Sequence, residues 1–295
     1  MFKVVFPVSK VKAFVFLPPL VAFLLAYFGA MAGVTGAFLL LPFQMSVLGY
    51  IAPSVSATNF TYNIVAIPGT VFRYAREGRM NWPLAAVITL GSLPGIACGY
   101  LLRVQFLSDP RIFKPFAGLV LLYLAWLVGR RGIAGKRKKV LPAIDARIRC
   151  TEFRVNRISY TFDGETYSFD PRPLSGVAFL VGVVGGAYGI GGGAVLAPFC
   201  ISVLQLPVHS VAGASLFGTF MSSLVGVLVY HFGFFSGGLS TRADYLLGAL
   251  FGLGGALGGY WGARMQKYIP ERPIKIGLLA VLLFVAARYL FAFLC

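Results

Sequence analysis

Charged side chains are scarce in this sequence, and acidic ones above all. Asp and Glu number nine among 295 residues, and none occurs between Asp170 and Asp244. There are only two histidines, and the four cysteines show no CxxC spacing. Metal centres, haem sites and disulfide frameworks need clustered ligands or paired cysteines, so we expect none of these, no metal site and no cofactor.

The composition favours a membrane protein. Charged residues make up 12% of the chain and hydrophobic ones 58%, whereas a soluble domain has about 25% charged residues. Several apolar stretches of about 20 residues predict an all-α polytopic integral membrane protein. We expect a multi-pass protein of the cell membrane, typical of a bacterial or archaeal inner membrane.

The net charge of +17 would suggest nucleic-acid binding in a soluble protein. Here Lys and Arg lie almost entirely between the apolar segments, as in cytoplasmic loops that face anionic lipid headgroups. The expected partners are therefore membrane lipids and not nucleic acid. The oligomeric state stays open, a homodimer included.

A polar middle divides the chain into a first transmembrane repeat (1–129), a basic cytoplasmic loop (130–173) and a second transmembrane repeat (174–295). The loop holds eleven Lys and Arg against five Asp and Glu.

Within this loop, Asp and Gly at 163–164 favour a two-residue turn. The turn predicts a β-hairpin in which Ile158 and Tyr160 face Phe169 and Tyr167.

The two halves are related in sequence, which identifies them as homologous repeats. At an offset of 156, the residues Gly29, Gly33, Gly36, Pro42, Phe43, Ser46, Ser54 and Val55 recur as Gly185, Gly189, Gly192, Pro198, Phe199, Ser202, Ser210 and Val211. At an offset of 160, Gly95, Gly99 and Tyr100 recur as Gly255, Gly259 and Tyr260. A duplicated unit with an interrupted apolar segment indicates a substrate site between the repeats.

The interruption is clearest in the second repeat. Residues 174–206 are 33 positions without Asp, Glu, Lys or Arg. As one straight helix they would be about 50 Å long, whereas a bilayer core is about 30 Å thick. Glycine costs about 1 kcal/mol per helix position relative to alanine, so we expect a break at 189–193.

Each repeat then consists of a Gly-broken helix or hairpin followed by three transmembrane helices. If the broken segment crosses the membrane, the repeats are parallel; if it turns back as a hairpin, they are inverted. Both alternatives place 18 basic residues inside and seven outside, with Arg288 in the last helix. The short arms, about 14–18 residues each, favour the hairpin and therefore inverted repeats.

A broken helix leaves unpaired N–H groups and a positive dipole end at membrane depth, where they can hold an anion without a buried cation. The predicted backbone and hydroxyl donors to a small anionic substrate are Thr35, Gly36, Gly191, Gly192, Gly193 and Ala194.

Neutral polar residues follow each break. Asn59 and Asn63 are four positions apart and share a helix face, as do Ser215 and Thr219 at the 156 offset. They can make hydrogen bonds between helices, or they can line the substrate site as donors; we favour the second interpretation.

Arg73 and Arg76 lie at the end of the apolar segment that contains Asn59 and Asn63. They can attract an anion to a cytoplasmic vestibule, but as ordinary positive-inside markers they need no such role, and that interpretation is favoured.

Two stretches that resemble enzyme motifs do not meet the requirements of those motifs. Ser215 and His231 are 16 positions apart on one predicted helix, about 24 Å, whereas a nucleophile and its base must lie within about 3 Å. The glycines at 189–194 formally match a dinucleotide fingerprint but lack the acidic residue that it needs about 20 positions later. We therefore expect no catalytic residues and no enzyme activity.

Two stretches resemble the sulfite exporter TauE/SafE family of membrane permeases, which are of the toluene-sulfonate uptake type. They are GIGGGAVLAP (189–198) with the Leu-Pro turn and VAGAS segment that follow it, and FRYAREGRMNWPLA (72–85). The resemblance covers nearly the whole chain apart from 130–173. One departure is Ala32 to Ala37, AGVTGA, where family members often have another GxGGG, so that the first anion site is altered or asymmetric.

The resemblance implies a secondary transporter, a permease or exporter, for a small sulfur-containing anion such as sulfite or a sulfonate. Two alternatives stay open: an anion channel of the same architecture, and a membrane scaffold or assembly protein. The direction of transport and the coupling ion, proton or sodium, are also open.

Overall fold

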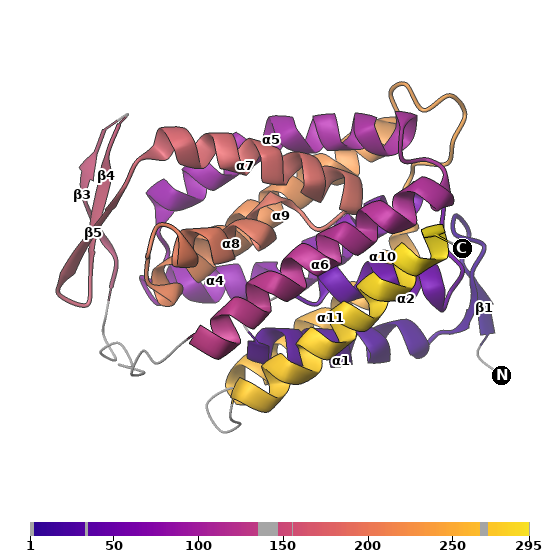
Figure 1. The fold of residues 1–295 in the computed structure, drawn as a ribbon, viewed down its shortest axis with the longest axis horizontal. Helices are drawn as coiled ribbons and strands as arrows, with labels where there is room; N and C mark the ends of the chain where they lie inside the picture. The colour runs from indigo at the N-terminus through magenta and orange to yellow at the C-terminus, as the bar shows by residue number, and fades with distance from the viewer. Residues whose placement is uncertain (1–2, 33–34, 135–146, 155, 266–270, 295) are drawn as a thin grey trace.

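The computed structural model describes residues 3–32, 35–134, 147–154, 156–265 and 271–294, which form an elongated bundle of helices with small β-structures at its two ends (Figure 1). The first half contains β1 (Lys3–Val5), β2 (Lys12–Phe14), α1 (Leu17–Ala32), α2 (Ala37–Ser46), α3 (Ser54–Ala66), α4 (Pro68–Arg76), α5 (Trp82–Gln105) and α6 (Pro110–Ala134). After these come β3 (Arg149–Phe153), β4 (Ile158–Phe162), β5 (Glu165–Phe169), α7 (Pro171–Tyr188), α8 (Gly192–Ser202), α9 (Val208–Phe232), α10 (Tyr245–Met265) and α11 (Glu271–Leu294).

The helices fit the predicted membrane protein. Three helical segments among the described residues are long and apolar enough to cross a membrane by themselves: α5, residues 110–127 of α6, and α9. Parts of α1, α2, α8 and α11 are shorter apolar helices. The chain is therefore a helical membrane protein in its general architecture.

A proline divides the segment from Ser54 to Arg76 into two helices. Helix α3 ends at Ala66 and α4 begins at Pro68. Proline has no N–H to donate to the carbonyl four residues earlier, so the helical hydrogen bonds are interrupted here, although Ile67 keeps helical dihedral angles (φ −88°, ψ −35°). The second half has no proline at this point, and α9 runs unbroken for 25 residues.

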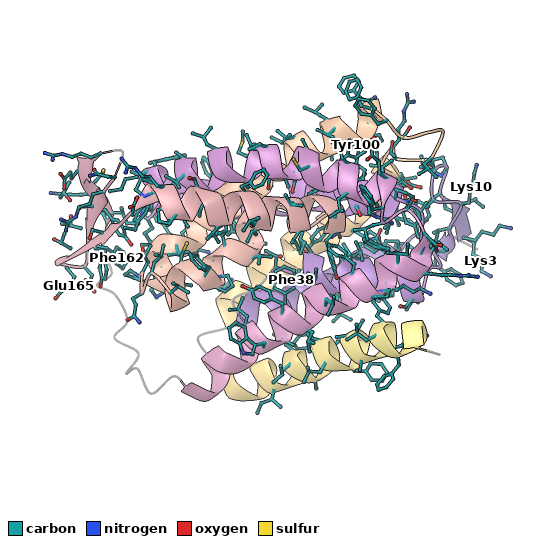
Figure 2. All side chains as sticks on the ribbon, turned by 45° about the horizontal axis from the view of Figure 1, so that its top comes forward. Lys3, Lys10, Phe38, Tyr100, Phe162 and Glu165 are labelled. Carbon is teal, nitrogen blue, oxygen red and sulfur yellow. The ribbon has the colours of Figure 1, made fainter. Side chains whose placement is uncertain are left out.

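The end of the bundle that carries β1 and β2 is called here the hairpin end, and the end that carries β3–β5 is called the sheet end. Figure 2 places Phe162 at the sheet end and Lys3 and Lys10 at the opposite end.

Helices α1 and α2 form a hairpin that returns to the end where it starts. Helix α1 follows β2, and the link between β1 and β2 donates from Val8 N and Ser9 N to Asp244 just before α10. Helix α2 leads to Ser54, whose N–H donates to Ser240 O at 3.2 Å in the same α9–α10 link. Phe38, near the start of α2, lies midway along the molecule (Figure 2). The segment therefore enters from the hairpin end and turns back.

Helices α7 and α8 do the same from the opposite end. Helix α7 begins directly after β5, at the sheet end. The Tyr160 hydroxyl of β4 lies 2.7 Å from Ser210 Oγ, in the first turn of α9 and soon after α8. The two broken segments thus enter the bundle from opposite ends, whereas α5, α6 and α11 run along the bundle (Figure 1).

Glycines let the helices pack closely. Helix α1 packs along α10, and α5 packs along α7. A Cβ atom at each of three α10 glycines would overlap an α1 carbonyl; the pairs are Gly254 with Pro19, Gly258 with Phe23, and Gly262 with Tyr27. Small residues at such spacing are typical of close helix pairs in membranes.

The β-structures are packed onto the bundle. Strands β4 and β5 are antiparallel, with Ile158 opposite Phe169 and Tyr160 opposite Tyr167, which are the pairs expected from the turn at 163–164. Burial raises the pKa of Tyr160 to about 12, so its hydroxyl stays protonated beside Ser210. Residues 135–146 of the predicted loop lie outside the described residues.

The all-α prediction missed strands in two places. Strand β3 pairs with β4, and β1 pairs with β2 directly before α1. Three-residue strands such as β1 and β2 leave too short an alternating pattern to be recognised among apolar residues.

Replacing Asp244 is expected to destabilise the protein strongly. Its buried carboxylate accepts hydrogen bonds from Val8 N, Ser9 N, Ser9 Oγ and Leu247 N. Asp244→Ala leaves these donors without a partner, and we expect a loss of at least about 3 kcal/mol, measured as a lower unfolding temperature in detergent.

The matched control is Asp109→Ala, which removes an exposed carboxylate that accepts from Arg111 N at the start of α6. It should cost about 1 kcal/mol or less. Equal losses for the two variants would contradict the anchoring role of Asp244.

Candidate functional site

The break between α7 and α8 has a backbone that only glycine adopts easily. Gly189 ends α7 with φ 88°, and Gly191 precedes α8 with φ 80°. Both values lie in the left-handed region, where a side chain is strained. A Cβ at Gly189 would also overlap the backbone of Ser56 in α3. The glycine cluster therefore permits both the turn and its close approach to α3.

Four of the carbonyl groups at the break accept hydrogen bonds from side chains of α3 and α9. The hydrogen bonds are Tyr230 Oη to Gly186 O (2.9 Å), Ser56 Oγ to Ala187 O (2.8 Å), Asn59 Nδ2 to Gly189 O (3.0 Å) and Asn63 Nδ2 to Ile190 O (3.2 Å). All four donors are buried side chains. At membrane depth, where water does not compete, these bonds make an interrupted helix tolerable.

Asn59 joins the two hairpins. Its Nδ2 also donates to Ala37 O at 3.2 Å, the first residue of α2. The Nδ2 of Asn63 makes a second bond to Ser223 Oγ on α9 at 3.2 Å. The face shared by the two asparagines thus holds α2, α7 and α9 together.

The start of α8 packs against α9. Gly192 N donates to Ser222 Oγ at 3.0 Å, and a Cβ at Gly193 would overlap Ser215 O. Thr219 Oγ1 donates to Ser215 O within its own helix, at 2.9 Å. Ser215 Oγ is buried and has no partner among the described residues.

These contacts bring together most of the predicted site residues. Residues 191–194, Asn59, Asn63, Ser215 and Thr219 all belong to the packed region where α3 and α9 meet the α7–α8 break. The amide N–H groups of the two asparagines, however, donate to protein groups, which is the interhelical bonding considered as the alternative. Whether this region also binds an anion stays a prediction.

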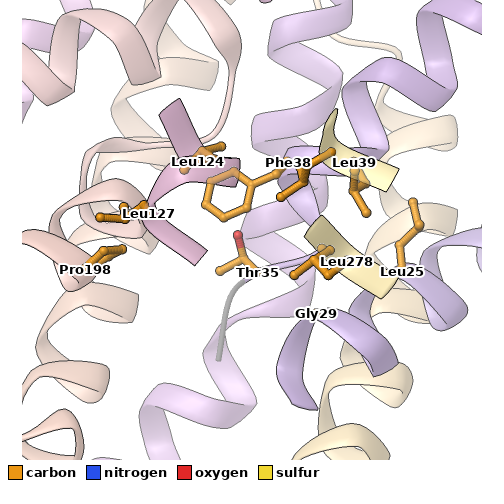
Figure 3. A pocket seen from close by; sticks show the side chains of 11 residues that line it. Leu25, Gly29, Thr35, Phe38, Leu39, Leu124, Leu127, Pro198 and Leu278 are labelled. Carbon is orange, nitrogen blue, oxygen red and sulfur yellow. The ribbon is translucent and has the colours of Figure 1, made fainter. Parts of the chain in front are cut away.

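Thr35 and Gly36 lie in a separate pocket between α1, α2, α6, α8 and α11 (Figure 3). The lining is apolar, with Leu25, Phe38, Leu124, Leu127, Pro198 and Leu278 among its residues. Among the described residues that line it, Thr35 alone has a polar side chain, and its buried Oγ1 has no partner there. The pocket therefore ends on the N-terminus of α2 and one free hydroxyl.

Arg73 and Arg76 are exposed on α4, near the sheet end. Arg73 Nε donates to Glu77 Oε1 at 2.8 Å, and this hydrogen bond holds the pKa of Glu77 below its ordinary value. Arg73 is thus partly neutralised by its neighbour. The vestibule role of the two arginines stays a prediction.

Several residues of this region were missed from the sequence. Ser56, Ser222, Ser223 and Tyr230 make the bonds described above, and each lies among several other polar residues of its helix, α3 or α9. The only signal in the sequence was that they are spaced at helical intervals from the predicted site residues on the same helices. Among the described residues, no group of three His, Cys, Asp or Glu is placed to hold a metal ion.

Gly193→Ala is expected to disrupt the contact between α8 and α9. The added Cβ would overlap Ser215 O and approach Thr219 N to 2.7 Å. Overpacking of this kind costs about 1–3 kcal/mol, so both the unfolding temperature in detergent and the function should fall.

The matched control is Gly259→Ala on α10, where an added Cβ meets nothing within 4 Å. It should be neutral or stabilise the helix by up to about 1 kcal/mol. If Gly193→Ala were as harmless as this control, the close contact at the start of α8 would be refuted.

Comparison with known proteins agrees with the architecture. A probable membrane transporter protein of Bacillus subtilis (strain 168), YunE, is 21% identical over 270 residues, which cover 89% of this chain and 92% of YunE. No solved structure gives a significant match. The family model of the sulfite exporter TauE/SafE matches residues 19–289. The match spans both halves of the chain, which therefore belongs to the sulfite exporter TauE/SafE family of membrane transporters.

Proposed function

We propose that the chain is a secondary transporter, a permease or exporter, for a small sulfur-containing anion held between two inverted repeats. The observation that carries the proposal is that α2 and α8 both begin inside the bundle, after breaks that enter from opposite ends. Two half-helix N-termini then present N–H groups and positive dipole ends to the interior without a buried cation.

The packing supports inverted repeats. The glycine contacts between helices are Gly95 with Phe179 and Gly99 with Val183 (α5 on α7), and Gly258 with Phe23 and Gly262 with Tyr27 (α10 on α1). The offset of 156 carries residues 23 and 27 to 179 and 183. The matching α5 and α10 glycines are therefore offset by 163 (258 − 95), and the packing favours this offset over the 160 taken from the sequence.

The β-structures extend the repeat. The same offset of 156 carries Phe6 to Phe162 and Ala13 to Phe169, and all four are buried against the bundle. Each repeat then begins with a β-hairpin that covers the end from which its helical hairpin enters. This explains why α1 and α7 both follow a strand directly.

The distribution of basic residues supports one orientation of the protein in the membrane. In sequence, the segments that join helices at the sheet end (73–79, 130–173 and 264–275) contain 18 Lys and Arg, and those at the hairpin end contain seven. By the positive-inside rule the sheet end is cytoplasmic. Arg73 and Arg76 then stand on the cytoplasmic side.

The pocket that ends on Thr35 is the proposed route to the anion site. An anion that reaches the start of α2 meets the Thr35 hydroxyl and the first backbone N–H groups of the helix. The proposed substrate class is taken from the family, which is described as sulfite exporters. We extend this class to sulfonates and related sulfur compounds.

Thr35→Val tests this site. The substitution keeps the shape of the side chain and removes its hydroxyl, so the protein should fold normally. A hydrogen bond to a charged group contributes about 1.5–3 kcal/mol, and its loss should weaken anion uptake into proteoliposomes about tenfold or more. Thr166→Val, on the exposed face of β5, is the control and should leave uptake unchanged.

The substrate class is read from the same proteoliposomes with labelled sulfite, a sulfonate, sulfate and a simple carboxylate. Saturable uptake confined to sulfite or sulfonates is the expected result. If all anions pass without saturation, the protein is a channel and the transporter proposal is wrong. If no anion is taken up, the proposed transport function is rejected.

A further inference from the structure

Two buried side-chain oxygens beside the α7–α8 break accept no hydrogen bond from the part of the chain that the structure describes. Asn59 and Asn63 are fully buried, and the Oδ1 atom of each lacks a partner among the described residues. Their orientation is fixed, because each Nδ2 donates to a backbone carbonyl, Gly189 O or Ile190 O. Rotating either amide by 180° would set two oxygens against each other. A buried acceptor left unpaired costs about 1–3 kcal/mol, so an occupant is called for.

The surroundings of these oxygens are suited to a cation. They belong to side chains whose Nδ2 atoms donate to the carbonyls of Gly189 and Ile190, at the C-terminal end of α7, which is the negative end of its dipole. Helices α2, α3 and α8 contain no charged residue, and the Arg and His residues of α7 and α9, which are Arg172, His209 and His231, stand at the ends of those helices. No charged side chain of these helices therefore lies beside the two oxygens to repel a positive ion.

The chemistry of the available ligands limits which ions could bind here. Amide and carbonyl oxygens are hard ligands that suit alkali and alkaline-earth ions and not zinc or copper. Divalent Ca²⁺ and Mg²⁺ sites in proteins are built with carboxylates, which are absent from these helices. Amides do not titrate near neutral pH, so a proton cannot be bound here either. A monovalent ion of the size and hardness of Na⁺ remains.

We propose that Asn59 Oδ1 and Asn63 Oδ1 are ligands of a Na⁺ site at the α7–α8 break, and that this ion is the coupling ion of transport. This rests on the proposed function, since the charge of the ion would favour an anion held at the N-termini of α2 and α8. Binding of each then strengthens binding of the other by the same factor.

The first experiment compares unfolding temperatures of the purified protein in NaCl and in choline chloride at equal ionic strength. We expect a saturable rise of several degrees with Na⁺. In Asn63→Asp the carboxylate adds a charge to the site, so the rise should occur at a lower Na⁺ concentration, although the variant is less stable without the ion because it has lost the bond to Ile190 O.

The matched control is Ser222→Ala. It removes a buried polar partner of the same break, the acceptor of Gly192 N, but no ligand of the proposed ion. It should lower stability equally in both salts while keeping the Na⁺ response. If ordered water fills the site, neither the wild type nor Asn63→Asp will distinguish Na⁺ from choline, and the proposal is overturned.

The second experiment separates this proposal from the transporter assignment. A sulfur anion is added in each salt, and uptake into proteoliposomes is measured with and without Na⁺. At least tenfold faster uptake with Na⁺ is expected. Equal uptake in both salts removes the coupling role while transport stands. A Na⁺ shift in a protein that transports no anion would keep the ion site and reject the proposed function.

Discussion

The structure depends on how the backbone carbonyls at the α7–α8 break are satisfied. A helix that stops at membrane depth exposes carbonyl groups that neither water nor its own next turn can pair. Here the donors are side chains of α3 and α9, among them Asn59 and Asn63. Because these donors come from two other helices, the broken segment, α3 and α9 must be assembled together. This requirement explains why polar side chains of α3 and α9 are buried beside the break.

The same requirement explains the glycines. Side-chain donors reach backbone carbonyls only if the helices approach closely, and at Gly189 a Cβ would overlap α3. Glycine also allows the left-handed turn that sends α8 back toward the sheet end. The polar face thus has a structural role first. A ligand at this break would use the groups that packing leaves over, Asn59 Oδ1 and Asn63 Oδ1, and a ligand in the separate pocket would use the hydroxyl of Thr35.

The sequence predicted the membrane class, the break at 189–193 and the family, because composition and glycine clusters are local properties. It also indicated the asparagine face, since two residues four positions apart must share one side of a helix. It could not say where the N–H groups of that face point, which depends on a partner about 130 residues away. The strands at Lys3–Val5 and Lys12–Phe14 were missed because they are short.

The central claim is that the two broken segments are hairpins that enter from opposite sides of the membrane, and side-specific cysteine labelling tests it most directly. Val47 and Val203 follow α2 and α8, are both exposed, and are 156 positions apart. After the native cysteines are replaced, a cysteine at each position is treated with a reagent that does not cross membranes. We expect labelling of position 47 only from outside the cell and of position 203 only from the cytoplasm. Labelling of both from the same side would mean that the segments cross the membrane, and it would contradict the account.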